Sequence, residues 1–177
     1  RDNHVIFISY YSYNSEKYYE FDIHPYFVKA FKKRWYVIAY SPGTNDIRCY
    51  ALDRMENVII SDKVFKMPKD LEPAEYFKDC FGIINNEDSE VLKVVLKVDA
   101  FQSNYIRNLP LHESQKEMKR TDEYSIFEYH LKPEFDFEQE IFSNMDTMEV
   151  LEPQWLREEV SERLRNLAKK YKICPSS

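Results

Sequence analysis

The sequence is poor in glycine, with only Gly43 and Gly82 among its 177 residues. Dinucleotide-binding loops need three glycines in a short G-x-G-x-x-G stretch, and phosphate-binding loops need two glycines followed by Lys. The G-x-S-x-G nucleophile elbow of many hydrolases also needs two closely spaced glycines. The sequence therefore excludes all three motifs and disfavours nucleotide hydrolysis and hydride transfer.

Cysteine is also scarce, because Cys49, Cys80 and Cys174 are widely spaced and form no C-x-x-C pair. This pattern predicts neither a disulfide framework nor a zinc site, and it favours the reducing cytoplasm. No apolar run approaches the roughly 18–20 residues that a membrane-spanning helix needs, so no membrane partner is expected. The chain also lacks a signal-sequence pattern. Its lack of an initiator Met predicts a fragment or a processed product.

Negative charge dominates, with a formal net charge of −6, but it is unevenly distributed. Residues 1–70 carry 11 Lys and Arg against 9 Asp and Glu, whereas residues 71–177 carry 14 against 22. The first part is therefore expected to attract anions more readily than the second. Neither part has the strong basic excess that is typical of a DNA-binding domain.

The first 65 residues are rich in aromatic and β-branched residues, which favour strands. The expected strands are residues 4–13, 18–28, 34–40, 50–54 and a short one within 55–65. The sequence RWYVIAY at 34–40 predicts a central strand that is buried on much of both faces. Turn-forming residues at 41–46 predict that it forms a β-hairpin with 50–54. Five short strands predict a small closed or nearly closed barrel.

The remaining residues alternate between strand and helix patterns. Residues 66–90 read as a connector in which a short helix at 74–81 ends at Gly82 as its C-terminal cap. The elements expected after it are a strand at 91–98, a helix at 99–108 capped by Asp99, strands at 111–119 and 124–131, a helix opened by Asp136, a strand at 148–151 and a final helix with Pro153 in its first turn. This order is that of a ferredoxin-like βαββαβ domain with a C-terminal helix. The predicted domains are therefore 1–66, a connector at 67–90, and 91–177.

Two ordered sets of residues resemble known families. The first is His24-Pro25-Tyr26, Arg34-Trp35-Tyr36-Val37, Arg48 and Leu52-Asp53-Arg54, which resembles the WYL domain, named for a Trp-Tyr-Leu triplet. The second is Leu111-His112-Glu113-Ser114-Gln115, Val150-Leu151-Glu152-Pro153 and Leu156-Arg157, which resembles the WCX extension of many WYL proteins. The resemblance implies an Sm/SH3-like barrel in the effector-binding half of bacterial transcriptional regulators, without the helix-turn-helix domain that usually precedes it.

One departure from the WCX pattern carries a structural expectation. The family often has Gly just before the last strand, where this chain has Asn144-Met145-Asp146. Asn and Asp tolerate a left-handed backbone better than other side chains do. We therefore expect Asn144 or Asp146 to adopt that conformation.

Arg48 and Arg54 are the strongest candidates for a binding site. Because side chains alternate along a strand, Arg48, Tyr50, Leu52 and Arg54 are expected on one face. Guanidinium groups suit phosphate or carboxylate ligands, whereas nearby carboxylates such as Asp53 offer structural ion pairs instead. Members of the WYL family are thought to bind regulatory ligands through polar and basic residues of the barrel. The resemblance therefore favours ligand binding for Arg48 and leaves both alternatives open for Arg54.

Aromatic and hydroxyl side chains could complete such a site. His24 and Tyr26 share a strand face, although a single His is more often a hydrogen-bonded structural residue. Residues 1–50 contain nine of the 14 tyrosines, which offer stacking surfaces for bases or, more simply, packing. Trp35 is assigned to the core in preference to the site. The complete set of candidate ligand-binding residues is Tyr10, Ser12, His24, Tyr26, Arg34, Trp35, Arg48 and Arg54.

No catalytic residues, metal ligands or cofactor are predicted. His112 and His130 fall on separate strands without metal-ligand spacing and are interpreted as structural. We predict the sensing and oligomerisation region of a regulator. In it a nucleotide or short single-stranded nucleic acid binds the Arg48, His24 and Tyr26 face and controls operator binding by an absent domain. A homodimer is expected, through the final helix or the connector. The alternative is an assembly module without a ligand, and a nucleic-acid enzyme is a third, disfavoured class.

Overall fold

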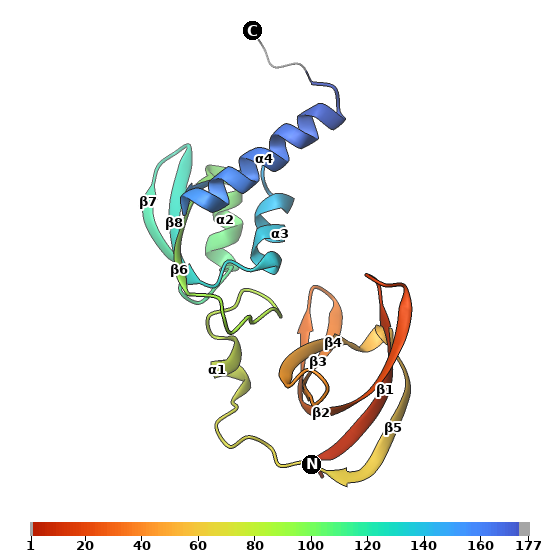
Figure 1. Ribbon diagram of the computed structural model, residues 1–177. Coiled ribbons are helices and arrows are strands. Elements are labelled where there is room, and N and C mark those ends of the chain that lie inside the picture. Colours follow the sequence, from red (N-terminus) through yellow and green to blue (C-terminus); the bar gives the residue numbers. More distant parts are fainter. Residues whose placement is uncertain (1, 174–177) are drawn as a thin grey trace. The chain divides into compact units, whose positions relative to one another are not determined.

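The computed structural model describes residues 2–173 and shows a chain that divides between Tyr76 and Phe77 into two compact units (Figure 1). Each unit is built on one antiparallel sheet, so the predicted combination of a mainly β part and an α+β part is confirmed. None of the helices within residues 2–173 is both long and apolar enough to span a membrane.

The first unit contains a five-stranded sheet with the order β4-β3-β2-β1-β5. Its strands are β1 (His4–Ser12), β2 (Lys17–Phe31), β3 (Arg34–Ser41), β4 (Asp46–Ala51) and β5 (Met55–Val64). The predicted hairpin is present, because β3 and β4 pair in antiparallel register with Val37 opposite Tyr50. Val37, Ile38 and Ala39 are buried, so β3 is covered on both faces at its centre, as the sequence predicted.

The sheet curls around its inner face without closing into a barrel (Figure 1). The order of the strands leaves β4 and β5 as edges that do not pair with each other within the described residues. Val58, Ile59 and Ile60 of β5 are consequently exposed. The apolar core lies on the inner face, where alternation brings Ile8, Ile23, Val37, Ala39 and Tyr50 together.

The strand predicted at 50–54 ends at Ala51, and Leu52–Arg54 form a 3₁₀ turn, η1, that leads directly into β5. The prediction that Arg48 and Arg54 lie on one strand face is therefore wrong. The turn is fixed at its end by Arg54, whose guanidinium group donates two hydrogen bonds to the backbone oxygen of Tyr11 in β1.

The second unit has the predicted ferredoxin-like order. Its main elements are β6 (Leu92–Asp99), α2 (Ala100–Asn108), β7 (Lys116–Arg120), β8 (Tyr124–Leu131), α3 (Phe135–Ser143), β9 (Met148–Glu152) and α4 (Gln154–Lys170). The sheet order β7-β8-β6-β9 places β6 between β8 and β9, antiparallel to both. The helices lie over one face of this sheet (Figure 1), and their apolar residues join Leu96, Phe127 and Val150 in a single core.

The caps of the helices were predicted with mixed success. Asp99 caps α2 as expected, since its Oδ1 accepts a hydrogen bond from the Gln102 amide at 2.7 Å. The helix predicted at 74–81 is only α1 (Pro73–Phe77), and Gly82 has no left-handed backbone. Asn144 has φ −127°, and Asp146 has no positive φ either, so the expected left-handed turn is absent from both residues.

Asp136 does not open α3, because the helix begins at Phe135 with Glu134 at its N-cap position. Its carboxylate instead accepts hydrogen bonds from the amides of Ile83 and Ile84. A Cβ atom on Gly82 would lie 2.3 Å from Asp136 Oδ2. Gly82 is therefore required for this close approach of two segments rather than for a helix cap.

Candidate ligand-binding site

A hollow of about 570 Å³ opens on the inner face of the first sheet, and we call it the arginine hollow. Its lining residues are Tyr10, Ser12, Asn14, Ser15, Tyr19, Phe21, Ser41, Gly43, Thr44, Arg48, Tyr50 and Arg54. Four of the predicted site residues are among them: Tyr10, Ser12, Arg48 and Arg54. The lining contains two arginines and no carboxylate.

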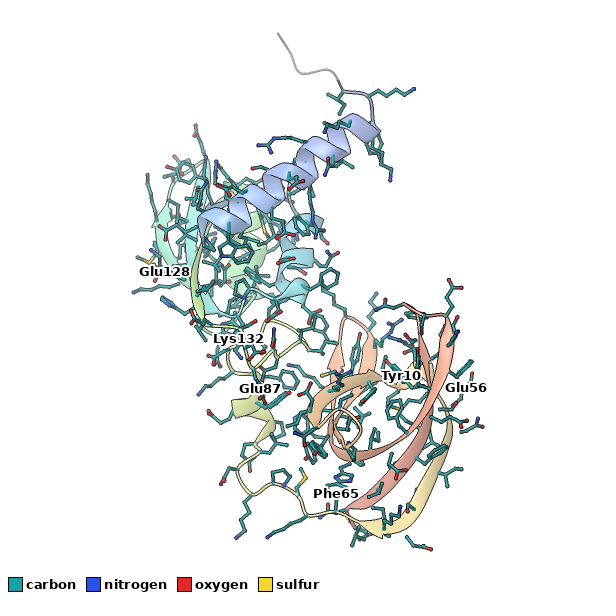
Figure 2. The ribbon with its side chains drawn as sticks, viewed as in Figure 1. Tyr10, Glu56, Phe65, Glu87, Glu128 and Lys132 are labelled. Atoms are coloured by element: carbon teal, nitrogen blue, oxygen red, sulfur yellow. The ribbon has the colours of Figure 1, made fainter. Side chains whose placement is uncertain are left out.

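Strand register explains how these residues meet. Tyr10 of β1 stands opposite Tyr19 of β2, and Arg48 of β4 stands opposite Ala39 of β3. Each belongs to the alternating set that also supplies the apolar core of the inner face, so the hollow continues that face beyond the core. Tyr10, labelled in Figure 2, packs edge-to-face against Tyr50 with ring centroids 5.1 Å apart. These rings give the hollow an aromatic floor.

Arg54 is held by the backbone and by aromatic rings rather than by an acid. Its Nε and Nη2 atoms donate to the Tyr11 oxygen at 2.8 and 2.6 Å. Its guanidinium carbon lies 4.6 Å from the centroid of the Tyr10 ring and 4.2 Å from that of Tyr13. Within the described residues it forms no ion pair, and its Nη1 atom makes no hydrogen bond. Its positive charge is therefore oriented but not neutralised.

Arg48 has a loose acidic partner. Its Nε atom lies 3.6 Å from Asp46 Oδ2, and both side chains are half exposed. An exposed ion pair of this kind contributes at most about 1 kcal/mol, so it opposes an incoming anion only weakly. Asp46 does not line the hollow. The electrostatic character of the hollow is consequently set by Arg48 and Arg54.

The two tyrosines of the floor remain neutral. Burial is the largest cause that raises the pKa of both Tyr10 and Tyr50 above the usual value. The Tyr10 hydroxyl also accepts a hydrogen bond from the Ala51 amide at 3.3 Å, which fixes its position. Both phenols therefore keep their protons at neutral pH.

His24 and Tyr26 lie in a different ring cluster from the arginines. His24 stacks on Phe65 with ring centroids 4.8 Å apart, and Tyr26 packs against the same ring at 5.9 Å. Figure 2 labels Phe65 away from Tyr10 in this unit. Neither His24 nor Tyr26 lines the arginine hollow. A ligand-binding role of His24 and Tyr26 stays a prediction.

Arg34 and Trp35 border a second hollow of about 670 Å³, which we call the lysine hollow. Its lining residues are Lys32, Lys33, Arg34, Trp35, Tyr36, Leu52 and Asp53. Arg34 Nε lies 3.1 Å from Asp53 Oδ2, so Asp53 pairs with Arg34 and not with Arg54. Trp35 is 56% exposed, and its assignment to the core is wrong. It lies one residue after the start of β3, outside the buried centre of that strand.

Several lining residues were missed at the sequence level. Tyr19 and Phe21 could have been found, because they share a strand face and pair with Tyr10 and Ile8. Asn14, Ser15 and Thr44 lie in turns, where no alternation indicates which way a side chain points. Loop residues of this kind become visible only once the strands they connect are placed.

The histidines of the second unit have structural partners. Buried His112 contacts the Ser114 hydroxyl through Nδ1 and the Lys78 oxygen through Nε2, and its role is structural as predicted. His130 lies 3.1 Å from Glu128 on an exposed face. No group of three His, Cys, Asp or Glu side chains within residues 2–173 is placed to hold a metal ion.

The fold and the hollows define a small curled β unit with a basic inner face, joined to a ferredoxin-like unit. Residues 1–60 match the family model of the WYL domain, and residues 90–168 match that of the WCX domain. The chain is therefore a WYL-domain protein whose second part is a WCX domain, as the sequence motifs predicted. No functionally curated protein matches the sequence.

Two solved structures show similarity to the chain. One is proteasome accessory factor B/C (PafBC) of Arthrobacter aurescens, with 19% identity and a TM-score of 0.41 over 99% of this chain and 26% of that protein. The other is described as a CRISPR Cas-related protein, with 12% identity and a TM-score of 0.58 over 96% of this chain and 48% of that one. The chain thus spans about a quarter and about half of the lengths of these proteins.

Proposed function

We propose that this chain is the effector-sensing region of a bacterial transcriptional regulator and that its effector is an anion bound in the arginine hollow. The observation that carries the proposal is the pairing of two arginines with an aromatic floor in a hollow without a lining carboxylate. The WYL and WCX domains support a regulatory role. In a chain with a net charge of −6, such a hollow is a local exception that favours anionic ligands.

The chemistry of the hollow suits a nucleotide or a short single-stranded nucleic acid. Guanidinium groups bind phosphate oxygens through charge-assisted hydrogen bonds, and the half-exposed ring of Tyr19 is available to stack on bases. The volume of about 570 Å³ is within the usual range for small-molecule sites. Ser12, Asn14 and Thr44 add hydrogen-bonding groups at the rim.

We propose binding rather than catalysis. The lining offers no histidine or carboxylate that could serve as a general base. The phenols of Tyr10 and Tyr50 have raised pKa values, chiefly through burial, which makes them weaker nucleophiles at neutral pH. The hollow would act by holding an anion, and the signal would pass to a DNA-binding domain outside this chain. Such coupling requires the ligand to bind one arrangement of the regulator more tightly than another.

We further propose that the regulator is a homodimer assembled through α4. Leu156 and Val160 are buried, but the same helical stripe continues through Leu164, Leu167 and Tyr171, which are exposed. The acidic residues Glu158, Glu159 and Glu162 precede the basic residues Arg163, Arg165, Lys169 and Lys170. Two antiparallel copies of α4 would bury the stripe and bring opposite charges together.

Sedimentation equilibrium of the double variant Leu164→Ser, Leu167→Ser tests the dimer contact. We expect the variant to be monomeric at concentrations where the original chain is a dimer. Phe101→Ser, which removes a more exposed apolar side chain from α2, serves as the control and should leave the dimer intact. An unchanged mass for the α4 variant would refute this contact and redirect attention to the connector.

Fluorescence anisotropy with labelled single-stranded DNA at two salt concentrations tests the ligand. We expect salt-sensitive binding that Arg48→Ala weakens by about tenfold, because charge-assisted contacts to phosphate are lost. Arg120→Ala removes the same charge from the exposed strand β7 and should have little effect. Equal binding by the original chain and Arg48→Ala would exclude this role for Arg48. Absence of anion binding altogether would support the alternative, an assembly module without a ligand.

A further inference from the structure

The turn between β2 and β3 places lysines where the backbone disfavours them. Phe31 pairs with Arg34, and the two residues between them, Lys32 and Lys33, have φ values of 44° and 65°. Two consecutive left-handed residues in a two-residue hairpin loop define a type I′ turn, for which Asn and Gly are preferred. The turn therefore presents two ammonium groups at some expense in backbone energy.

Trp35 follows these lysines and leaves more than half of its surface exposed beside the lysine hollow. A large ring gains most by burial, and an exposed indole next to cations is well suited to stack on a planar base. Arg34, on the same short segment, is paired with Asp53, the only carboxylate that lines this hollow. The segment thus combines a stacking surface with a cationic edge.

The lysine hollow adjoins the arginine hollow across η1. Leu52 and Asp53 of η1 line the lysine hollow, whereas the next residue, Arg54, lines the arginine hollow. Tyr13 also lies near both hollows. The centroid of its ring is 4.2 Å from the guanidinium carbon of Arg54. The pKa of Arg34 is raised mainly by Asp53 and to a lesser extent by Tyr13. Together the two hollows are lined by five cationic side chains and one carboxylate.

We propose that the lysine hollow is a second nucleic-acid subsite, so that the WYL domain binds an extended single strand that crosses η1 rather than a single nucleotide. Trp35 stacks on a base of this strand, and Lys32 and Lys33 contact its phosphates. This inference rests on the proposed function, because the first subsite is the arginine hollow. It adds a requirement for length, since a ligand confined to the arginine hollow cannot reach Trp35.

Affinity as a function of ligand length tests the second subsite. We compare a thymidine dinucleotide with an oligothymidylate of about ten nucleotides, within the range of known single-strand site sizes. The original chain should bind the longer ligand at least about tenfold more tightly, because a stacked base and added phosphate contacts contribute. Trp35→Ala and the double variant Lys32→Asn, Lys33→Gly should each remove most of this gain. Neither should change the affinity for the dinucleotide.

The double variant is a matched design, because Asn-Gly keeps the type I′ turn while it removes both charges. Phe101→Ala, which truncates an exposed ring of the second unit, is the control for nonspecific loss of aromatic surface. Arg48→Ala should weaken both ligands equally. Equal length gains in the original chain and in both lysine-hollow variants would overturn the second subsite while leaving the proposed function intact. No binding of either ligand by the original chain would overturn both.

Tryptophan fluorescence gives an independent readout. The chain has two tryptophans, so Trp155→Phe leaves Trp35 as the only source of tryptophan emission. Stacking of a base on Trp35 should quench this emission with the longer oligothymidylate and not with the dinucleotide. Saturating binding without any change in emission would contradict the stacking role of Trp35.

Discussion

The two sheets of this protein are covered to different extents. In the second unit, one face of the sheet is covered by α2, α3 and α4, and the core cluster contains 13 buried residues. In the first unit the corresponding cluster contains five, and β5 leaves Ile60 69% exposed. Since closed apolar packing supplies most of the stability of a small domain, the second unit is expected to be the more stable one.

The incomplete core of the first unit leaves room for binding. Its inner face passes from apolar residues such as Ile8 and Val37 to the aromatic and cationic lining of the arginine hollow. In the second unit the core between the sheet and the helices includes Phe127, Tyr129 and Phe137, which leave no exposed surface. In the first unit, part of one side of the sheet thus carries a binding hollow, whereas in the second unit the covered side is filled by the core.

Truncation of one apolar residue in each sheet is the strongest test of this difference. Phe127→Ala in β8 should lower the free energy of unfolding of the second unit by about 3–5 kcal/mol, because it leaves a cavity in a closed core. Ile60→Ala in β5 should lower that of the first unit by less than about 0.5 kcal/mol. Hydrogen exchange of amides in β8 and β5 at a series of urea concentrations measures the two free energies of unfolding. Similar losses for the two variants would show that β5 is covered in solution.

The two glycines provide a second test of packing in the two units. Gly82→Ala should cost about 1–3 kcal/mol, since its Cβ would lie 2.3 Å from Asp136 Oδ2 and disturb the hydrogen bonds to Ile83 and Ile84. Gly43→Ala in the first unit is the matched control, because nothing lies within 4 Å of its Cβ position. Thermal unfolding compares the two. A stable Gly82→Ala variant would mean that Asp136 can move away.

One ion pair in the second unit predicts a small effect of pH on the stability of that unit. Hydrogen bonds from Arg107 lower the pKa of Glu117 from 4.5 to about 2. Because the folded pKa is below the unfolded value, this pair contributes stability above pH 4.5 and loses it as the pH falls towards 2.

The expected contribution is about 1 kcal/mol, reduced by solvent screening because Glu117 is partly exposed. Chemical unfolding of the original chain and of Glu117→Gln at a series of pH values measures it. The difference between them should shrink between pH 4.5 and 2. A difference that does not depend on pH would contradict the role of the ion pair.

Much of the fold could be predicted because it follows from local patterns. The alternation at Leu92–Asp99 and the cap at Asp99 indicate the start of the ferredoxin-like unit, and turn residues at 41–46 indicate the first hairpin. Contacts between distant segments could not be predicted. Gly82 is explained by Asp136, which lies 54 positions later in the chain, so its role as a cap was a reasonable but wrong expectation.

The candidate site shows the same limit. The residue types of Arg48 and Arg54 indicated an anion, but the η1 turn that separates them depends on the Tyr11 oxygen of another strand. His24 shares a strand with lining residues of the arginine hollow and still belongs to another ring cluster, because Phe65 packs on it. Trp35 is a largely apolar residue, but it lies near the start of β3, where its side chain is exposed. Residue chemistry therefore predicts the class of ligand better than the set of residues that bind it.

Hydrogen exchange measured with and without a single-stranded oligothymidylate tests most directly the claim that the ligand binds to the first unit. We predict that the ligand protects amides at 10–21 and 41–54, around the arginine hollow, and leaves the core strands at 92–99 and 124–131 unchanged. Protection that is confined to the second unit, with no change around Arg48 and Arg54, would contradict the account.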